Sequence, residues 1–185
     1  MQALFLTRKG AFFFLIYFQY VSPFQEVSMR FPEIKTESPS GWEVRLPQAA
    51  KGRIALVVIR FSSGEDEPAV DSWRRPFMNE FGESPQYVFY EVIMVSDIWD
   101  KGLSGTFDRS EQRGVPITNH ENVLTYYGES GPYSKMLGMD DPAICHAFLL
   151  DREGNVVWSG DGRAATDKID LMARAARAAT QKRAA

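Results

Sequence analysis

An almost unbroken run of β-branched and other apolar residues, IALVVIRF, occupies positions 54–61. A strand with one solvated face alternates apolar and polar residues, whereas a continuous run is typical of a strand that is covered on both faces. The run ends abruptly at SSGEDEP, which contains the turn-forming residues glycine, serine and proline. Any fold for this chain must therefore place residues 54–61 inside a sheet with a layer packed on each side.

The residues that follow predict a helix over Ala69–Phe81. Pro68 suits the first turn of a helix, and Gly82 ends it. A second buried run, YVFYEVIMV, then predicts a strand within Gln86–Val95. One helical face carries apolar residues at spacings of three and four: Val70, Trp73, Phe77 and Phe81. Two buried strands joined through a helix predict a parallel βαβ unit.

The other elements follow from shorter patterns. FPEIKTESPSG, at 31–41, is rich in proline and serine and is interpreted as a loop that leads into the domain. Residues Ser96–Thr118 show weak periodicity and predict an irregular excursion. The remaining expected elements are strands at Trp42–Leu46, Asn122–Tyr127 and His146–Leu150, a short helix at Tyr133–Leu137 closed by Gly138, a hairpin turn at Asp151–Gly154 with Val156–Trp158 returning, and a last helix capped by Thr166 with Ile169, Met172, Ala173 and Ala176 on one face.

This order predicts an α/β fold of the thioredoxin-like kind, with a mixed sheet built as βαβ and then ββα and helices on both faces. The alternative is an ordinary doubly wound fold. The hairpin turn at Asp151–Gly154 argues against that alternative, because a hairpin pairs its strands antiparallel.

Composition narrows the chemistry. The formal net charge of −3 gives no basic surplus of the kind that nucleic-acid binders carry, so we expect no nucleic-acid partner. Cys145 is the only cysteine, which excludes an intramolecular disulfide and any CxxC pair. Two histidines, His120 and His146, are too few for a zinc site with the usual partners. We expect no cofactor and no metal.

Residues 1–28 differ from the rest and are treated as a separate apolar segment ahead of a domain at 29–185. The run AFFFLIYFQYV follows Arg8 and Lys9 and is shorter than the stretch of about 20 residues that a transmembrane helix needs. A basic start before an apolar run resembles a targeting segment, although no A-x-A cleavage site follows. Three interpretations stay open: a targeting or anchoring segment, a segment packed on a partner, or a non-native extension with the domain beginning at Met29.

The last third of the chain reads CHAFLLDREGNVVWSGDGRAATDKIDLM and resembles the mitochondrial ATP-synthase assembly factor ten family. That family shares an apolar strand ending in L-L-D, a turn, a strand ending in an I/V-x-W pair, and a G-x-G/A element before a helix. Three further segments are similar to parts of that family. LVVIRFSSG with WRRPFMNEF is similar to its first strand and helix, YVFYEVIMV to its second strand, and YSKMLGMDD to its short helix and loop.

The resemblance implies a redox-inactive assembly chaperone or scaffold for a membrane complex of mitochondria, most naturally ATP synthase. It implies a protein partner that is a subunit of that complex, and a location at the inner membrane on the matrix side. The alternatives are a permanent accessory subunit and a divergent one-cysteine peroxiredoxin-like enzyme that uses Cys145. We expect no enzyme activity, with a weak thiol-dependent activity at Cys145 kept as the exception.

In thioredoxin-like enzymes the nucleophilic cysteine lies in the loop after the first core strand, where a helix N-terminus stabilises a thiolate. Here that loop has no cysteine and carries three acids, Glu65, Asp66 and Glu67. They are interpreted either as complements of the helix dipole or as an acidic loop that contacts a partner.

The second active-site element of such enzymes is a cis-proline shortly before the strand that ends in L-L-D. Here Cys145 occupies that position beside His146, and Pro142 lies earlier. Neighbours on a strand point to opposite faces, so the thiol and the imidazole are not expected to touch. The interpretations are a buried structural cysteine with His146 at an edge, a one-cysteine peroxidase or transferase, or another role such as metal binding.

Two further features stay as candidates. Gly160–Asp161–Gly162 precedes a helix and is either a tight turn or an anion site. The last helix and tail carry a basic face, either solvated or attracted to an anionic surface or acidic partner. Its members are Arg163, Lys168, Arg174, Arg177, Lys182 and Arg183, with Arg174 and Arg177 as the candidate partner-binding residues.

Deleting residues 1–28 is expected to release most of the protein from membranes while the rest stays folded, because the expected core begins only at Trp42. Burial of the apolar run is nearly insensitive to salt, whereas attraction of basic residues to an anionic surface fades with ionic strength. Charge reversal at Arg174 and Arg177 should therefore weaken attachment only at low salt. Membrane fractionation with carbonate and salt washes measures both effects. A truncated protein that still pellets fully with membranes would contradict the anchor role, and one that unfolds would make the segment part of the domain.

Overall fold

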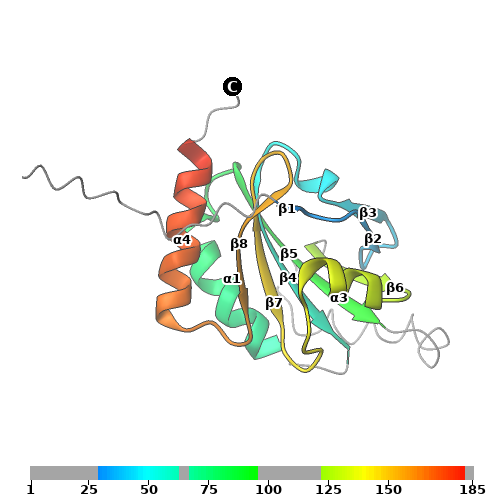
Figure 1. Cartoon of the computed structure of the whole chain (residues 1–185). Helices are drawn as coiled ribbons and strands as arrows, with labels where there is room; N and C mark the ends of the chain where they lie inside the picture. The colour runs from blue at the N-terminus through cyan, green and yellow to red at the C-terminus, as the bar shows by residue number, and fades with distance from the viewer. Residues whose placement is uncertain (1–28, 63–66, 96–121, 182–185) are drawn as a thin grey trace, which may run out of the picture.

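An eight-stranded mixed sheet organises the computed structural model, which describes residues 29–62, 67–95 and 122–181 (Figure 1). The strands lie in the order β1-β8-β7-β4-β5-β6-β2-β3. Their bounds are β1 Met29–Arg30, β2 Ile34–Glu37, β3 Glu43–Leu46, β4 Ile54–Phe61, β5 Tyr87–Val95, β6 Val123–Tyr127, β7 His146–Leu150 and β8 Asn155–Asp161. The described helices are α1 Glu67–Phe81, α3 Gly131–Leu137 and α4 Thr166–Gln181, with a 3-10 turn at Gln48–Ala50.

Strand β4 lies at the centre, as its unbroken apolar run predicts, and all eight of its residues are buried. It pairs parallel with β5 through the α1 crossover and antiparallel with β7. The parallel strand β6 continues from β5, and the hairpin at Asp151–Gly154 returns β8 antiparallel to β7. The predicted mixed sheet is therefore confirmed.

Helices cover both faces, as expected. Helices α1 and α4 pack on one face, where their apolar residues meet Leu56, Val58 and Leu149. Helix α3 lies on the other side of the sheet (Figure 1), where Leu137 joins a core that contains Val57 and Ile59. Alternate residues of β4 thus belong to different cores, which is the period of two that a pleated strand imposes.

The interpretation of 31–41 as a loop is wrong, because β2 lies within it. Ile34 and Thr36 are buried while Lys35 and Glu37 are exposed, so the segment alternates as a strand with one covered face does. It forms an antiparallel hairpin with β3 and also pairs with β6 at Glu37↔Thr125. The prolines and serines on either side of this short strand concealed its alternation.

The expected start of the core at Trp42 is also wrong. Phe31 and Ile34 are buried in the core on the α3 side, and Phe31 stacks edge-on against Phe148 with ring centroids 5.9 Å apart. Trp42 instead projects into solvent, with 72% of its surface exposed. Deletion of residues 1–28 still removes none of the described strands, since β1 begins at Met29.

The helix ends follow the local signals. Pro68 is the second residue of α1, where its missing N–H has no carbonyl to bond. Gly138 closes α3 with a φ of 66°, a left-handed conformation that favours glycine. In α4 the expected apolar face is buried at Met172, Ala173 and Ala176.

Several expectations fall outside the described residues: the role of the apolar segment at 1–28, the irregular excursion at Ser96–Thr118, and the part of the basic face at Lys182 and Arg183. Among the helices that the structure describes, none combines the length and the apolar content needed to cross a bilayer.

Trp73 holds α1 to the far end of the chain. Its side chain is fully buried, and the indole Nε1–H donates to the Gly162 carbonyl over 2.7 Å. The ring also meets Trp158 of β8 edge-on, with centroids 5.4 Å apart. One side chain therefore links α1, β8 and the turn that leads into α4.

Replacing Trp73 by alanine is expected to lower the free energy of unfolding by about 3–5 kcal/mol, since the change leaves a large cavity. Urea denaturation measures the loss as a lower midpoint at unchanged slope. Trp42→Ala is the matched control, and we expect it to change stability by less than about 0.5 kcal/mol because that ring is exposed. Equal midpoints for Trp73→Ala and the wild type would show that α1 does not depend on this contact.

Candidate functional site

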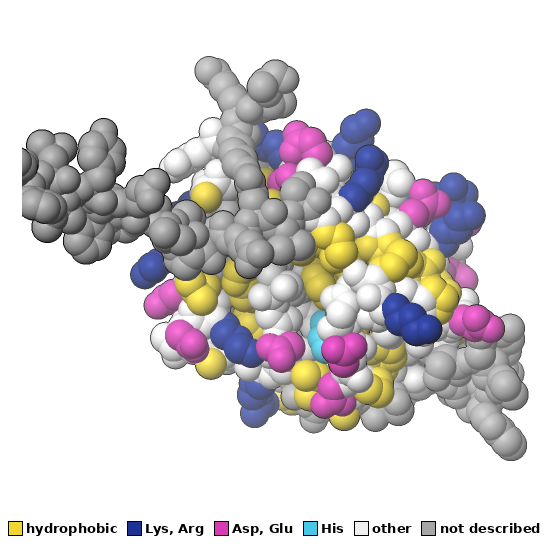
Figure 2. All heavy atoms as spheres, viewed as in Figure 1, with side chains coloured by type: hydrophobic (Ala, Val, Ile, Leu, Met, Phe, Trp, Pro, Cys, Tyr) yellow, Lys and Arg dark blue, Asp and Glu magenta, His cyan; other side chains and the backbone are white. Residues whose placement is uncertain are grey.

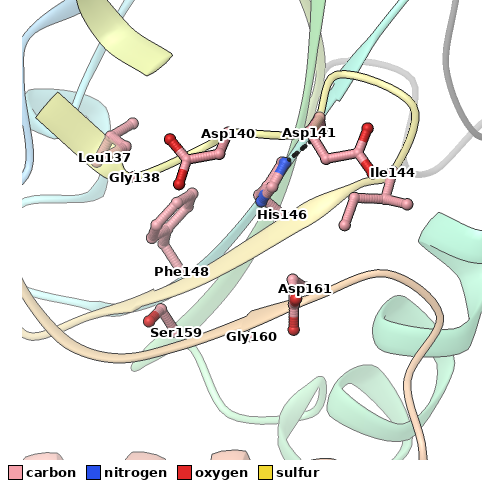
Figure 3. Close-up of a pocket in the computed structure, with 10 residues that line it drawn as sticks. All are labelled: Leu137, Gly138, Asp140, Asp141, Ile144, His146, Phe148, Ser159, Gly160 and Asp161. Carbon is pink, nitrogen blue, oxygen red and sulfur yellow. Dashed lines mark hydrogen bonds between the residues drawn. The ribbon is translucent and has the colours of Figure 1, made fainter. Parts of the chain in front are cut away.

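A cavity of about 310 Å³ opens between the amino end of β7, the end of β8 and the loop after α3 (Figure 3). We call it the His146 cavity. It lies on the α3 side of the sheet, at the end to which the carboxyl terminus of β4 leads, since Ile59 of β4 pairs with His146. Its lining residues are Leu137, Gly138, Asp140, Asp141, Ile144, His146, Phe148, Ser159, Gly160 and Asp161.

Strand pairing sets the floor of the cavity. His146 lies directly opposite Asp161 across β7 and β8, and Phe148 lies opposite Ser159. Residues opposite each other in an antiparallel pair share a face, so all four side chains point to the same side of the sheet. Pairing therefore brings Asp161 to His146 from a distant part of the sequence.

The wall of the cavity comes from the loop after α3. The left-handed Gly138 ends the helix, and the chain turns back along residues 140–144. The Asp141 carboxylate holds this turn by accepting a hydrogen bond from the Ala143 backbone N–H over 2.8 Å. Asp140 is exposed, and none of the described residues forms a hydrogen bond or ion pair with its side chain.

The position of the His146 proton follows from its partner. His146 is only 6% exposed, and its Nε2 lies 2.9 Å from the backbone carbonyl oxygen of Asp141. A carbonyl oxygen can only accept, so Nε2 carries a proton and donates it. In the neutral ring Nδ1 then holds a lone pair, and none of the described residues donates a hydrogen bond to it.

Asp161 is the carboxylate of the cavity with a defined cationic partner. The pKa of Asp161 lies below its ordinary value, chiefly because Lys168 donates a 2.6 Å hydrogen bond to Oδ1. Partial burial opposes this shift, while the Lys168 charge and, more weakly, His146 add to it. The carboxylate is therefore held ionised beside the cavity.

Cys145 points away from the cavity, as the alternation along β7 predicts. It is fully buried in the core with α1 and α4, and its Sγ–H donates to the Gly162 carbonyl oxygen over 3.3 Å. The Gly162 N–H in turn donates to the Cys145 carbonyl oxygen over 2.7 Å. This reciprocal pair makes Cys145 a packing residue of the turn before α4.

The same contacts favour the tight-turn interpretation of Gly160–Asp161–Gly162 over an anion site. The Gly162 N–H is already used, and its φ of 62° is the left-handed conformation that favours glycine. A Cβ at Gly160 would approach the rings of Trp158 and Trp73 to 3.0 Å or less.

The expectation that His146 lies at an edge is wrong, because β7 lies between β8 and β4.

The other predicted residues are dispersed. Glu65 and Asp66 lie outside the described residues. Glu67 is the first residue of α1, and its Oε1 lies 3.7 Å from Arg74 Nη2, which agrees with a role at the helix end. Arg174 is exposed, and Arg177 pairs with Glu80 over 2.5 Å. Both arginines belong to α4, on the opposite side of the sheet from the cavity.

Sequence reasoning selected His146 but missed the residues that surround it. Phe148 was recoverable, because it alternates with His146 along β7. Asp140 and Ser159 carried no signal, since only the fold of the loop and the register of β8 bring them to the cavity. Within residues 29–62, 67–95 and 122–181, no three His, Cys, Asp or Glu side chains gather closely enough to hold a metal ion.

The sequence matches no family model and no curated protein. Solved structures do match. The chain is similar to a thiol:disulfide interchange protein DsbE from Chlorobium tepidum, with 18% identity, a TM-score of 0.54, and coverage of 82% of this chain and 96% of that one. This chain has a thioredoxin-like fold. Yeast Sco1 with copper bound is similar at 15% identity and a TM-score of 0.56, over 84% of this chain and 98% of that one.

A third similar structure is BsSco, described as a member of the Sco family of cytochrome c oxidase assembly proteins, at 15% identity and a TM-score of 0.56 over 84% of this chain and 96% of that one. In a thioredoxin-like fold the loop after β4 is where redox enzymes carry their nucleophilic cysteine. This chain has no cysteine there. Its only thiol, that of Cys145, directly precedes β7 and faces the core under α1 and α4, on the other side of the sheet from the cavity.

Replacing Lys168 by glutamine is expected to raise the pKa of Asp161, because the ammonium charge is removed and the shorter amide side chain can donate only a neutral hydrogen bond. A lowered folded pKa stabilises the fold above the ordinary carboxyl pKa and loses that contribution as pH falls through the lowered value. Asp161 is 61% exposed, so the shift should shrink with added salt. Carbon-detected NMR titration of the carboxyl measures it. Lys135→Gln, a change at an exposed lysine of α3, is the control and should leave the Asp161 titration unchanged.

Proposed function

We propose that this chain is a non-catalytic binding protein, an assembly chaperone or scaffold that holds a segment of a protein partner in the His146 cavity. The observation that carries the proposal is the placement of its one thiol. Cys145 is fully buried, is hydrogen-bonded to the turn at Gly162, and faces away from the cavity. A thiolate nucleophile must meet its substrate, and this sulfur is covered.

The cavity itself suits binding. Its lining combines the apolar side chains of Leu137, Ile144 and Phe148 with polar side chains that can form hydrogen bonds, among them Asp140, His146 and Ser159. The space-filling view shows a cyan histidine side chain recessed on this face and bordered by magenta acidic side chains (Figure 2). Hydrogen-bond acceptors beside apolar side chains can orient a side chain of a partner without any chemical step.

The partner class rests on the resemblance of the last third of the chain to the ATP-synthase assembly factor family. We propose a subunit of a membrane complex as the partner, with ATP synthase at the matrix side of the mitochondrial inner membrane as its most specific form. The similarity to BsSco supports assembly work as a use of this fold, but only as a fold-level analogy. A permanent accessory subunit would use the same surface and would differ by staying in the finished complex.

The enzyme alternative has a direct test. Cys145→Ser replaces the thiol by a hydroxyl, which can make the same hydrogen bond to the Gly162 carbonyl oxygen. We therefore expect a loss of stability under about 1.5 kcal/mol. We expect the variant to co-purify with the native membrane complex as the wild type does, measured by mass spectrometry. A thiol-dependent peroxidase assay should give no rate above background for either protein. A peroxidase rate that the wild type has and Cys145→Ser lacks would overturn the proposal.

A further inference from the structure

The His146 cavity offers hydrogen-bond acceptors and few donors. The carboxylates of Asp140 and Asp161 belong to its lining, and Nδ1 is the His146 ring nitrogen that is left to accept a hydrogen bond, because Nε2 donates to the Asp141 carbonyl oxygen. The Asp141 carboxylate is taken by its own loop through the Ala143 N–H. A ligand that complements these groups must supply N–H donors and positive charge.

His146 gives a second indication that is independent of the acidic residues. Its side chain is 6% exposed, and Figure 3 shows the second ring nitrogen on the side of the ring that faces Phe148 and Asp140. None of the described residues donates to that nitrogen. This nitrogen is not fully enclosed, so a donor from a molecule bound in the cavity can reach it and form a hydrogen bond with it.

The shape of the cavity selects among cations. The Phe148 ring lies on its floor, with the apolar Leu137 on the same side of His146 and the apolar Ile144 on the other side (Figure 3). A guanidinium is planar, stacks on aromatic faces, and presents five N–H donors in a fixed fork, whereas an ammonium is a compact and strongly hydrated charge. Acceptors on several sides of an apolar, aromatic floor suit the guanidinium with its aliphatic stem.

Building on the proposed function, we propose that the His146 cavity takes an arginine side chain of the protein partner. The guanidinium donates to the Asp140 carboxylate and to His146 Nδ1 while its plane rests on Phe148. Asp161 contributes less, since Lys168 already occupies its Oδ1 at 2.6 Å. The partner segment is thus expected to present an arginine to this face of the sheet.

The probe is N-acetyl-arginine amide, titrated into the full chain and followed by amide and histidine-ring NMR shifts. Its neutral isostere, N-acetyl-citrulline amide, has nearly the same shape without the charge. We expect arginine-induced shifts to centre on Asp140, His146 and Phe148, with citrulline binding at least about tenfold weaker because charge-assisted hydrogen bonds are lost. Equal binding of the two probes, or shifts centred elsewhere, would overturn the inference.

Matched variants distinguish binding in the cavity from long-range electrostatic attraction by the whole protein. Asp140→Asn should weaken arginine binding at least about fivefold, because it removes the charge and keeps the shape. Asp170→Asn removes the same charge from an exposed position on α4, on the other side of the sheet, and should leave binding unchanged. An equal loss in both variants would show long-range attraction and contradict a site.

The same two variants distinguish this inference from the function on which it rests. Co-purification with the native membrane complex should fall for Asp140→Asn and hold for Asp170→Asn. If both variants capture the complex as well as the wild type, the arginine site is wrong while the binding function stands. If the wild type itself captures no complex, the proposed function fails, and the titration with the arginine probe still decides whether the cavity binds a guanidinium.

Discussion

The pairing of β4 on both of its sides is the constraint on which the rest of the structure depends. This strand hydrogen-bonds in parallel with β5 and antiparallel with β7, and all of its side chains are buried. A parallel neighbour requires a crossover, which α1 supplies, and both faces require cover. Even its one charged residue, Arg60, is satisfied inside the sheet by Glu91 over 2.8 Å. The cavity lies at the sheet end toward which β4 runs.

A second constraint is the period of two along β7. It sends Cys145 into the helix-covered core and His146 into the cavity, so that neighbours in sequence have unrelated surroundings. The thiol is fixed there through Gly162, whose carbonyl oxygen also accepts the Trp73 indole N–H. Helix α1, the Cys145 thiol and the turn before α4 therefore pack as one structural unit. The sheet separates this unit from the groups that face the cavity.

This separation is compatible with the binding function proposed here, in a fold that is shared with a thiol:disulfide interchange protein. The loop after β4 has no cysteine, and the one thiol of the sequence is used in packing. What the end of the sheet retains is a concave site with an aromatic floor and acceptors around it. Such a site can recognise a side chain by charge and shape alone, which agrees with the assembly role proposed here.

Local pattern was enough to predict much of this protein. The apolar runs at 54–61 and 87–95, the helical spacing around Trp73, and the hairpin turn before β8 each depend on neighbours within a few residues, and each was confirmed. The alternation along β7 likewise separated Cys145 from His146 without any structure. The short strand β2 was missed, because its alternation spans only four residues between prolines and serines.

Only the tertiary structure decided which residues share a site. Asp140 reaches His146 through the turn after Gly138, and Asp161 and Ser159 reach it through the register of β8 against β7. Arg177 finds Glu80 because α4 packs beside α1. Such contacts depend on register and packing between segments far apart in the chain. A periodic pattern shows which face of a segment is buried, but it does not show what that face meets.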